Sequence, residues 1–448
     1  MQTTLRFEVR RLFTLAAPVI VTQVATMMLG VVDTMMVGHV DVSTLAAASL
    51  GHVWTFGTLI FAMGVVFGMD PLITQAQGAG DPARMGLTLQ RGLVVSGLMG
   101  IPVALLWMAT SPILQLLGQD PALAARAQTY AVVQIPSIPF FMAFTALRQY
   151  LQGRSIVIPT LWVALAANVV NVGLNWVLIF GHLGFPELGL TGAGMATGGT
   201  RIFLCLGLLA LTRAGRLLEG GWTPWNRRAL DLAGLREILY YGTPVGMQFA
   251  LEVWAFQCTT LLAGRLGTVE LAAHTVVLNL ASLSFMVPLG LSLAAVTRVG
   301  NLIGAGDQLA AQRVAWISFG LGASLMTVSA TIFLTLRNHL PLLFTPDAAI
   351  IALAATILPI AGAFQLFDGT QVVGGGILRG IGSTRPAAVF NLVGYYAFAL
   401  PLAIWLTFSR GHGLAGLWWG LAGGLGVVSL MLLAWVRWRG PARAVRVV

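Results

Sequence analysis

The chain contains no lysine, only two cysteines and few charged residues of any kind. Charged residues make up 9% of its 448 residues and hydrophobic residues make up 57%, whereas charged residues are roughly a quarter of a soluble protein. This composition excludes a soluble globular protein. Both cysteines, Cys205 and Cys258, lie within apolar stretches, so they predict neither a disulfide nor a metal site.

Several motifs that would mark an enzyme or a nucleic-acid-binding protein are also missing. The sequence has no P-loop, HExxH, CxxC pair or GxSxG, which argues against ATP hydrolysis and intramembrane proteolysis. Its six histidines are scattered rather than clustered, so an integral-membrane enzyme is not expected. The net charge of +10 comes from 25 arginines spread over successive loops without interleaved aromatics, so nucleic acid is not an expected partner.

Long apolar stretches recur from one end of the chain to the other. Each is long enough to cross a bilayer as a helix, which takes about 20 residues. We therefore predict an all-α integral membrane protein with twelve transmembrane helices, at about 12–37, 47–73, 92–115, 127–150, 159–181, 190–212, 238–263, 272–298, 313–336, 350–377, 386–408 and 414–436.

The two halves of the chain repeat one another. Pro18 and Pro244 stand 226 residues apart, and the four-residue stretch 78–81, Gly-Ala-Gly-Asp, recurs at the same offset at 304–307. A proline within an apolar helix removes one backbone donor and favours a bend, so Pro18 predicts helix bending. An identical loop at a constant offset indicates an internal duplication.

The duplication predicts two pseudo-symmetric six-helix bundles, 1–212 and 238–448, joined by a linker at 213–237. Because each half has an even number of spans, both halves insert with the same orientation, as in transporters with parallel repeats. Twenty arginines fall in segments that would then be cytoplasmic, and four fall on the other face. The positive-inside rule therefore predicts that both termini are cytoplasmic.

Acidic residues within the spans are the first candidates for chemistry. Asp33, Glu252 and Asp368 lie deep, where charged groups usually mark proton or ion pathways. Burial favours the protonated form of a carboxyl group, so these side chains could bind and release a proton near working pH. Asp70, beside Pro71 and near a span end, is better explained as structural. Arg201 also lies within a span, and neither it nor Asp70 receives a predicted role.

Polar amides accompany these acids. Asn171 and Asn175 are four residues apart and so share one helix face. They could help to hold a cation near Asp33 or could bond to another helix. The same two alternatives apply to Gln248 and Gln371, which lie four residues before Glu252 and three after Asp368.

Large apolar side chains lie in the same spans as the acids. Most would face lipid or the helix core, but a subset that includes Met27, Trp254 and Phe364 could form an adaptable wall for varied hydrophobic ligands.

Several stretches taken together carry a family resemblance. They are Pro18…Asp33-Thr-Met-Met-Val-Gly38, the two Gly-Ala-Gly-Asp loops, Leu378-Arg379-Gly380 and Gly189-Leu-Thr-Gly-Ala-Gly. In order and spacing they resemble the multidrug and toxic compound extrusion (MATE) family, over about residues 10 to 435. The presence of Glu252 and Asp368 together with Asp33 resembles the NorM-like branch.

The resemblance implies a V-shaped pair of bundles in the inner membrane. It implies export of hydrophobic, often cationic, compounds by antiport with Na⁺ or H⁺, with no cofactor and no enzymatic activity. Asp33, Asn171 and Asn175 correspond to polar positions of the first half. Glu252 and Asp368 correspond to the second-half acids implicated in cation coupling, where Na⁺ would bind. Small drugs and membrane lipids are the implied partners, and a monomer is expected.

One position departs from the NorM-like branch. That branch can carry a tyrosine four residues before the acid of the tenth span, and this chain has Phe364 there. Without that hydroxyl, sodium coordination at this corner has less support, so the choice between Na⁺ and H⁺ stays open.

Two other membrane-protein classes are weaker alternatives. A flippase for lipid-linked precursors has a related bundle plan, but it would line its cavity with basic residues, and the deep charges here are mostly acidic. A facilitator-type twelve-helix transporter would carry a charged loop after its second span, and here that loop is Gly-Ala-Gly-Asp.

Overall fold

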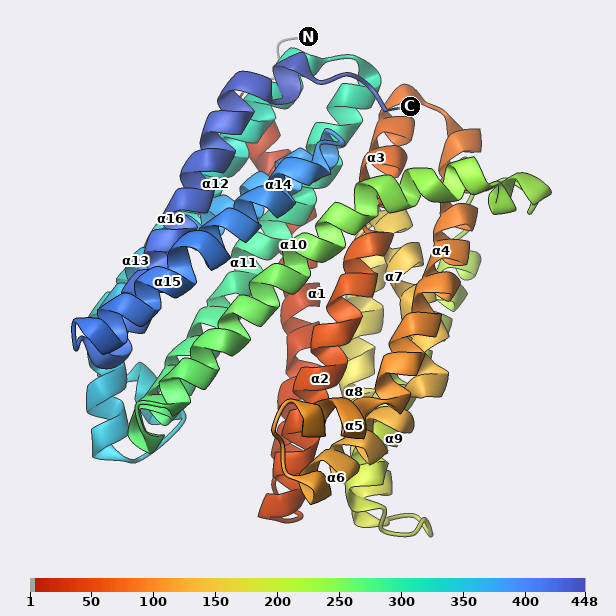
Figure 1. The fold of residues 1–448 in the computed structure, drawn as a ribbon. Helices are drawn as coiled ribbons and strands as arrows, with labels where there is room; N and C mark the ends of the chain where they lie inside the picture. Colours follow the sequence, from red (N-terminus) through yellow and green to blue (C-terminus); the bar gives the residue numbers. More distant parts are fainter. Residues whose placement is uncertain (1–4, 448) are drawn as a thin grey trace. The chain divides into compact units, whose positions relative to one another are not determined.

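The structure, a computed structural model, describes residues 5–447, and within this range it contains helices and no strand (Figure 1). The α-helices are α1 (Leu5–Val37), α2 (Val42–Val66), α3 (Met69–Ala79), α4 (Pro82–Met108), α5 (Thr110–Leu116), α6 (Pro121–Val132), α7 (Ile138–Gly153), α8 (Ile158–Phe180), α9 (Gly189–Ala214), α10 (Leu232–Gly264), α11 (Thr268–Ala305), α12 (Gln308–Thr335), α13 (Ala348–Gly380), α14 (Thr384–Asn391), α15 (Leu400–Ile404) and α16 (Gly413–Arg439).

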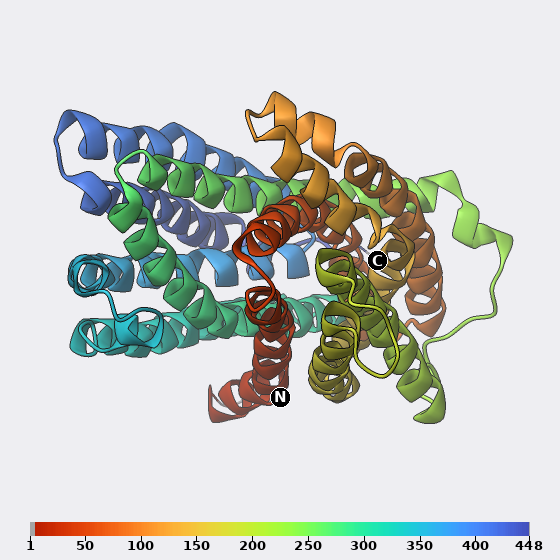
Figure 2. The same ribbon diagram turned by 90° about the horizontal axis from the view of Figure 1, so that it is seen from below.

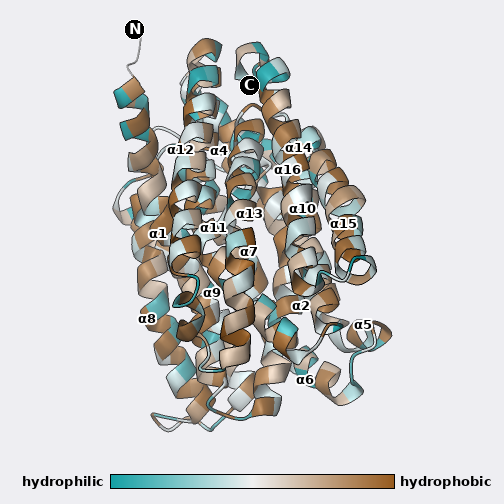
Figure 3. Ribbon diagram, turned by 90° about the vertical axis from the view of Figure 1, so that its left-hand side faces the viewer, coloured by the Kyte–Doolittle hydropathy of each residue, from teal (hydrophilic) through white to brown (hydrophobic). Residues whose placement is uncertain are grey.

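Eleven helical segments of the described chain are long and apolar enough to cross a membrane, and apolar residues cover most of their length (Figure 3). They coincide with eleven of the twelve predicted spans. The structure also has a helix at the remaining one, 238–263, where α10 is 33 residues long. This helix is less apolar than the other eleven segments because Gln248, Glu252 and Gln257 lie in its central part.

Four of the predicted spans are interrupted helices. The third, 92–115, is divided between α4 and α5 at Ala109. The second is divided between α2 and α3 at Phe67-Gly68, and the fourth between α6 and α7, where a 3-10 turn at Ile135–Ser137 contains a proline. In the eleventh span, α14 leads into a π-helix at Leu392–Ala399, followed by α15 and a second π-turn at Trp405–Ser409. Such π-segments are rare, and they often occur at functional sites.

The described residues form two compact units, which we call the 21–246 unit and the 247–447 unit; the second also includes residues 5–20. Each has its own apolar core. In the 21–246 unit, α8 and α9 lie side by side (Figure 2), and buried side chains of α1, α2, α6, α8 and α9 pack together. In the 247–447 unit, α11, α12, α13 and α16 pack together with the beginning of α1.

The compact units and the sequence repeats divide the chain at different residues. The beginning of α10 packs in the 21–246 unit, where a Cβ on Gly64 would come within 2.4 Å of the Gly246 Cα. The beginning of α1 packs in the 247–447 unit, where a Cβ on Gly290 would come within 2.8 Å of the Ile20 backbone nitrogen. Because the two contacts are related by the offset of 226, the duplication extends from the sequence to helix packing.

The repeated Gly-Ala-Gly-Asp loops have the same cap geometry. Gly80 and Gly306 end their helices with φ of 70° and 85°. Asp81 and Asp307 begin the next helices, and each side chain accepts a hydrogen bond of 2.9 Å from the backbone nitrogen three residues later. Left-handed backbone is readily adopted only by glycine, and aspartate is a favoured N-cap. The repeated Gly-Asp pairs therefore specify a sharp turn between two helices.

Gly80→Ala is expected to lower the free energy of unfolding by about 1 kcal/mol, because alanine at a φ of 70° pays the left-handed penalty. Thermal unfolding of the purified protein in detergent measures the effect. Gly97→Ala is the control, since Gly97 is helical and an added Cβ there meets no atom within 4 Å. An equal loss in both variants would contradict this explanation.

The linker between the repeats packs on the 21–246 unit. Arg154 donates to the carbonyl oxygens of Leu217 and Glu219, the latter at 2.8 Å. Gln90 donates to the Thr223 carbonyl oxygen at 2.8 Å. These bonds satisfy carbonyl oxygens of the linker that lie outside regular helices, and they fix the linker to α4 and to the end of α7.

A buried ion pair anchors the beginning of α1 within the 247–447 unit. Arg298 of α11 donates from Nε and Nη2 to the two carboxylate oxygens of Glu8, at 2.9 and 2.7 Å. Both side chains are less than a tenth exposed. The two-point geometry makes this a strong pair, and the loss of one partner would leave a buried charge unpaired.

Glu8→Gln is therefore expected to lower the free energy of unfolding by about 3 kcal/mol, the lower end of the effect of breaking a buried pair. Thermal unfolding in detergent is again the measurement. Glu219→Gln is the matched control, because Glu219 pairs with Arg216 on the surface, with side chains 69% and 80% exposed, and such pairs contribute little. Similar losses in both variants would show that burial of the pair is unimportant.

Candidate cation and substrate sites

Asp33 lies at the centre of a cluster of neutral hydrogen-bond donors in the 21–246 unit. Asn171 and Asn175 of α8 donate from Nδ2 to its Oδ1 at 2.9 and 2.6 Å. Thr197 of α9 donates to its Oδ2 at 2.7 Å. The asparagines are one helical turn apart, so both face α1. The structure thus brings together three residues that the sequence singled out, and adds Thr197.

This cluster can accept a positive charge. Asp33 is 6% exposed, and it forms no ion pair with any residue in the described chain. The Oδ1 of Asn175 is buried and has no hydrogen-bond partner there. A buried acceptor without a donor is costly. A carboxylate beside such an oxygen therefore suits a proton, an ammonium group or a small cation.

Glu252 lies at the centre of a second cluster, in the 247–447 unit. Gln371 of α13 donates from Nε2 to its Oε2 at 3.0 Å. Asn391, the last residue of α14, lies 3.5 Å from the same oxygen and donates to the Gln248 backbone carbonyl at 3.4 Å. The π-helix begins directly after Asn391. These contacts fix α10 to α13 and α14.

Residues of the second cluster carry oxygen atoms that have no hydrogen-bond partner among the described residues. The Oε1 atoms of Gln248 and Gln371 and the Tyr395 hydroxyl are buried without a hydrogen bond to any described residue. Asp368 is 4% exposed and lies near Glu252 and Tyr395. Carboxylate, amide and hydroxyl oxygens are the ligands of hard cations, so this donor set fits Na⁺ as well as a proton.

The three predicted apolar positions lie in different environments. Phe364 is 2% exposed and packs edge-on against Trp418 and Phe256, with ring centroids 5.6 and 6.0 Å away. Trp254 is 36% exposed on α10, and Met27 is half-buried on α1. Phe364 is therefore a core residue of the 247–447 unit, whereas Trp254 and Met27 present apolar surface.

Asp70 and Arg201 receive local explanations. Asp70 is 2% exposed, and Gln149 of α7 donates to it at 2.7 Å, which fits a helix-packing role. The Arg201 guanidinium lies over the rings of Trp107 and Phe141, 5.5 and 5.2 Å from their centroids. Cation–π contacts of this kind stabilise a charge away from water.

Sequence reasoning missed Thr197, Asn391 and Tyr395. Thr197 follows the Gly189-Leu-Thr-Gly-Ala-Gly run on α9, so it was a detectable polar residue within an apolar span. Asn391 was detectable in the same way. Tyr395 gave no such signal, because the π-helix changes which residues share a face and so departs from the 3.6-residue period.

Comparisons with known proteins agree with this architecture. The MatE family model matches residues 18–177 and 244–405, one copy in each repeat. The "Multidrug resistance protein NorM" of Burkholderia vietnamiensis is 34% identical over 427 residues, covering 94% of this chain and 92% of that protein. The "Probable multidrug resistance protein NorM" of Rhizobium meliloti is 35% identical over 430 residues, covering 93% and 91%.

Solved structures show the same fold. The eukaryotic MATE transporter AtDTX14 is 26% identical with a TM-score of 0.91, over 98% of this chain and 97% of that one. The MATE transporter VcmN of Vibrio cholerae in its bent form is 20% identical with a TM-score of 0.84, over 97% and 98%. The chain is thus a membrane transporter rather than an enzyme, and it belongs to the MATE family.

Proposed function

We propose that this transporter exports hydrophobic and cationic compounds by antiport with Na⁺ or H⁺. Its NorM relatives are described as multidrug resistance proteins, which supports a drug substrate class. The observation that carries the proposal is the pair of carboxylate clusters, one in each compact unit. Neither Asp33 nor Glu252 forms a salt bridge with any described residue, although the charge of Arg201 interacts with that of Asp33.

Coupling follows from competition for these carboxylates. In the outward-facing state a proton or Na⁺ neutralises a carboxylate and lowers its affinity for a cationic drug. In the inward-facing state the ion leaves and the drug binds again. The cycle works only if each state has a different affinity for each ligand, since otherwise no free energy is transferred between the two gradients.

We assign the two coupling functions to different clusters. The three side chains that contact the Asp33 carboxylate all donate hydrogen bonds to it and so do not serve there as oxygen ligands of a metal cation. We therefore assign a proton or a drug ammonium group to this cluster. Near Glu252 and Asp368, the oxygens of Gln248, Gln371 and Tyr395, which have no hydrogen-bond partner among the described residues, favour Na⁺. The Tyr395 hydroxyl would supply the oxygen ligand for Na⁺ that the phenyl ring of Phe364 cannot provide.

The remaining expectations complete the proposal. The protein would lie in the inner membrane as a monomer with both termini in the cytoplasm, as the arginine distribution favours. The repeats 1–212 and 238–448 would alternate access to the substrate around the linker 213–237. Pro18 lies inside α1 at the end of the stretch that packs in the 247–447 unit, a suitable position for bending.

Uptake of a fluorescent lipophilic cation into inverted vesicles would test the proposal. A sodium gradient and a pH gradient are imposed separately, with the wild-type protein and with empty vesicles as the reference. We expect the sodium gradient to drive uptake. Uptake with a pH gradient alone would overturn the sodium assignment and keep the antiport, whereas uptake that needs neither gradient would overturn the antiport itself.

A further inference from the structure

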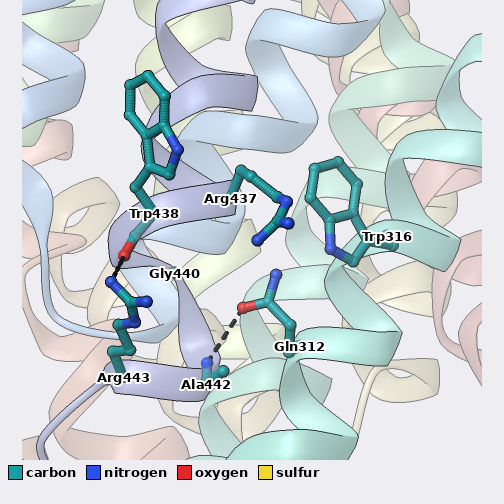
Figure 4. Close-up of a pocket in the computed structure, with 7 residues that line it drawn as sticks. All are labelled: Gln312, Trp316, Arg437, Trp438, Gly440, Ala442 and Arg443. Atoms are coloured by element: carbon teal, nitrogen blue, oxygen red, sulfur yellow. Dashed lines mark hydrogen bonds between the residues drawn. The ribbon is translucent and has the colours of Figure 1, made fainter.

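A pocket of about 250 Å³ lies where α16 ends and α12 begins, within the 247–447 unit and away from both carboxylate clusters. Its lining residues come from these two helix ends and from the turn after α16 (Figure 4). They are Gln312, Trp316, Arg437, Trp438, Gly440, Ala442 and Arg443. Two of the seven are arginines, two are tryptophans, and none is acidic.

The turn after α16 holds this pocket in shape. Gln312 accepts a hydrogen bond from the Ala442 backbone nitrogen at 3.0 Å and donates to the Val436 carbonyl oxygen at 3.2 Å. A Cβ on Gly440 would come within 2.1 Å of that same carbonyl oxygen, so the turn requires glycine. Arg443 donates to the Trp438 carbonyl oxygen at 2.8 Å (Figure 4).

The pocket carries positive charge that no described acidic residue neutralises by an ion pair. Arg437 and Arg443 form no ion pair with any described residue. Arg443 uses one Nη1–H on a backbone carbonyl, and its other N–H groups remain available to a ligand. Two guanidinium groups without a carboxylate are the usual means of binding a phosphate group.

The position of the pocket identifies the source of that phosphate. It lies at the end of a membrane-spanning segment, Gly413–Arg443. The Trp438 and Trp316 side chains are 66% and 38% exposed, and tryptophan favours the boundary between lipid and water. Basic pockets between helix ends at this boundary bind anionic lipid head groups.

We propose that this pocket binds the phosphate head group of an anionic membrane lipid. Arg437 and Arg443 contact the phosphate oxygens, and the two indoles pack against the glycerol and upper acyl region. Such a lipid would join the end of α16 to the beginning of α12. Free inorganic phosphate offers the same chemistry to the arginines but gives the indoles nothing to pack against, so the lipid is the expected occupant.

Native mass spectrometry of the purified protein would test this proposal. The protein is exchanged into detergent with phosphatidylglycerol, with phosphatidylcholine, or with phosphatidylglycerol plus millimolar inorganic phosphate. Arg437→Gln is compared with Arg439→Gln, the matched control. Arg439 is on the same helix turn with the same charge, but it lies over the Trp435 ring, 5.9 Å from its centroid, and does not line the pocket.

We expect wild-type protein to retain phosphatidylglycerol in preference to phosphatidylcholine, also in the presence of phosphate. Arg437→Gln should reduce the retained lipid roughly five-fold, the contribution of one arginine near an anionic surface, and Arg439→Gln should leave it unchanged. Equal losses in both variants, or no preference for the anionic lipid, would overturn the site. Displacement by millimolar phosphate would overturn the lipid as its occupant.

Discussion

Replacement of Asp33 by asparagine is expected to abolish gradient-driven export while the protein still folds. The carboxylate is the charge for which a proton and a cationic drug would compete, so its neutralisation removes the differential affinity that couples them. Coupling free energies of this kind correspond to roughly 5- to 150-fold changes in affinity. Uptake by inverted vesicles, compared with wild type at equal protein content, is the measurement.

The Asp33 cluster allows the substitution without a folding defect. An asparagine oxygen can still accept from Asn171 and Asn175. Its side-chain nitrogen can donate to the Thr197 hydroxyl oxygen. The Thr197 hydroxyl can then donate to the Ala193 carbonyl oxygen, 3.0 Å away. Thermal unfolding close to that of wild type would verify that the variant is folded.

Asp41→Asn is the matched control for Asp33→Asn. Asp41 is an exposed N-cap of α2, and its hydrogen bonds from Thr44 hold its pKa below the usual range. Asparagine caps a helix about as well as aspartate. This variant therefore removes one carboxylate charge outside the Asp33 cluster and keeps the helix cap. Full export activity in Asp33→Asn, or an equal loss in Asp41→Asn, would refute the proposed role of Asp33.

Replacement of Glu252 by glutamine or Asp368 by asparagine should remove the response of the protein to sodium. A ligand that binds only the folded protein raises its unfolding temperature, by an amount that grows with the ligand concentration relative to Kd. Sodium chloride is therefore expected to stabilise the wild type in detergent more than choline chloride does. In either variant the difference between the two salts should vanish, whereas Asp33→Asn should retain it.

The two adjacent tyrosines provide a sharper comparison at the same site. Tyr395→Phe removes the hydroxyl near Glu252 and Asp368 that has no hydrogen-bond partner among the described residues. The sodium concentration needed for the same stabilisation should rise roughly tenfold, within the range of coupling effects. Tyr396→Phe removes a hydroxyl that donates to the Leu251 carbonyl oxygen at 3.1 Å, and it should leave the response intact. A sodium response that survives in Glu252→Gln and Asp368→Asn would place the ion elsewhere.

Much of the fold could be predicted because its signals are local. Runs of apolar residues define the spans, and the Gly80-Asp81 and Gly306-Asp307 pairs define identical turns, since a left-handed glycine and an aspartate cap act within a few residues. The acids could be found because charge within an apolar run is rare. Asn171 and Asn175 could be paired because they share a helix face.

The sequence by itself determined that this protein is a duplicated, helical membrane transporter with acids at membrane depth, because apolar length, repeat offset and isolated charge are properties of the chain. Only the tertiary structure decided which groups meet those acids. Thr197 reaches Asp33 across 164 residues and Asn391 reaches Glu252 across 139, and such contacts depend on helix packing. The tertiary structure also decided that the beginning of α1 packs in the 247–447 unit and the beginning of α10 in the 21–246 unit. These positions depend on glycines that allow two helix backbones to come into contact.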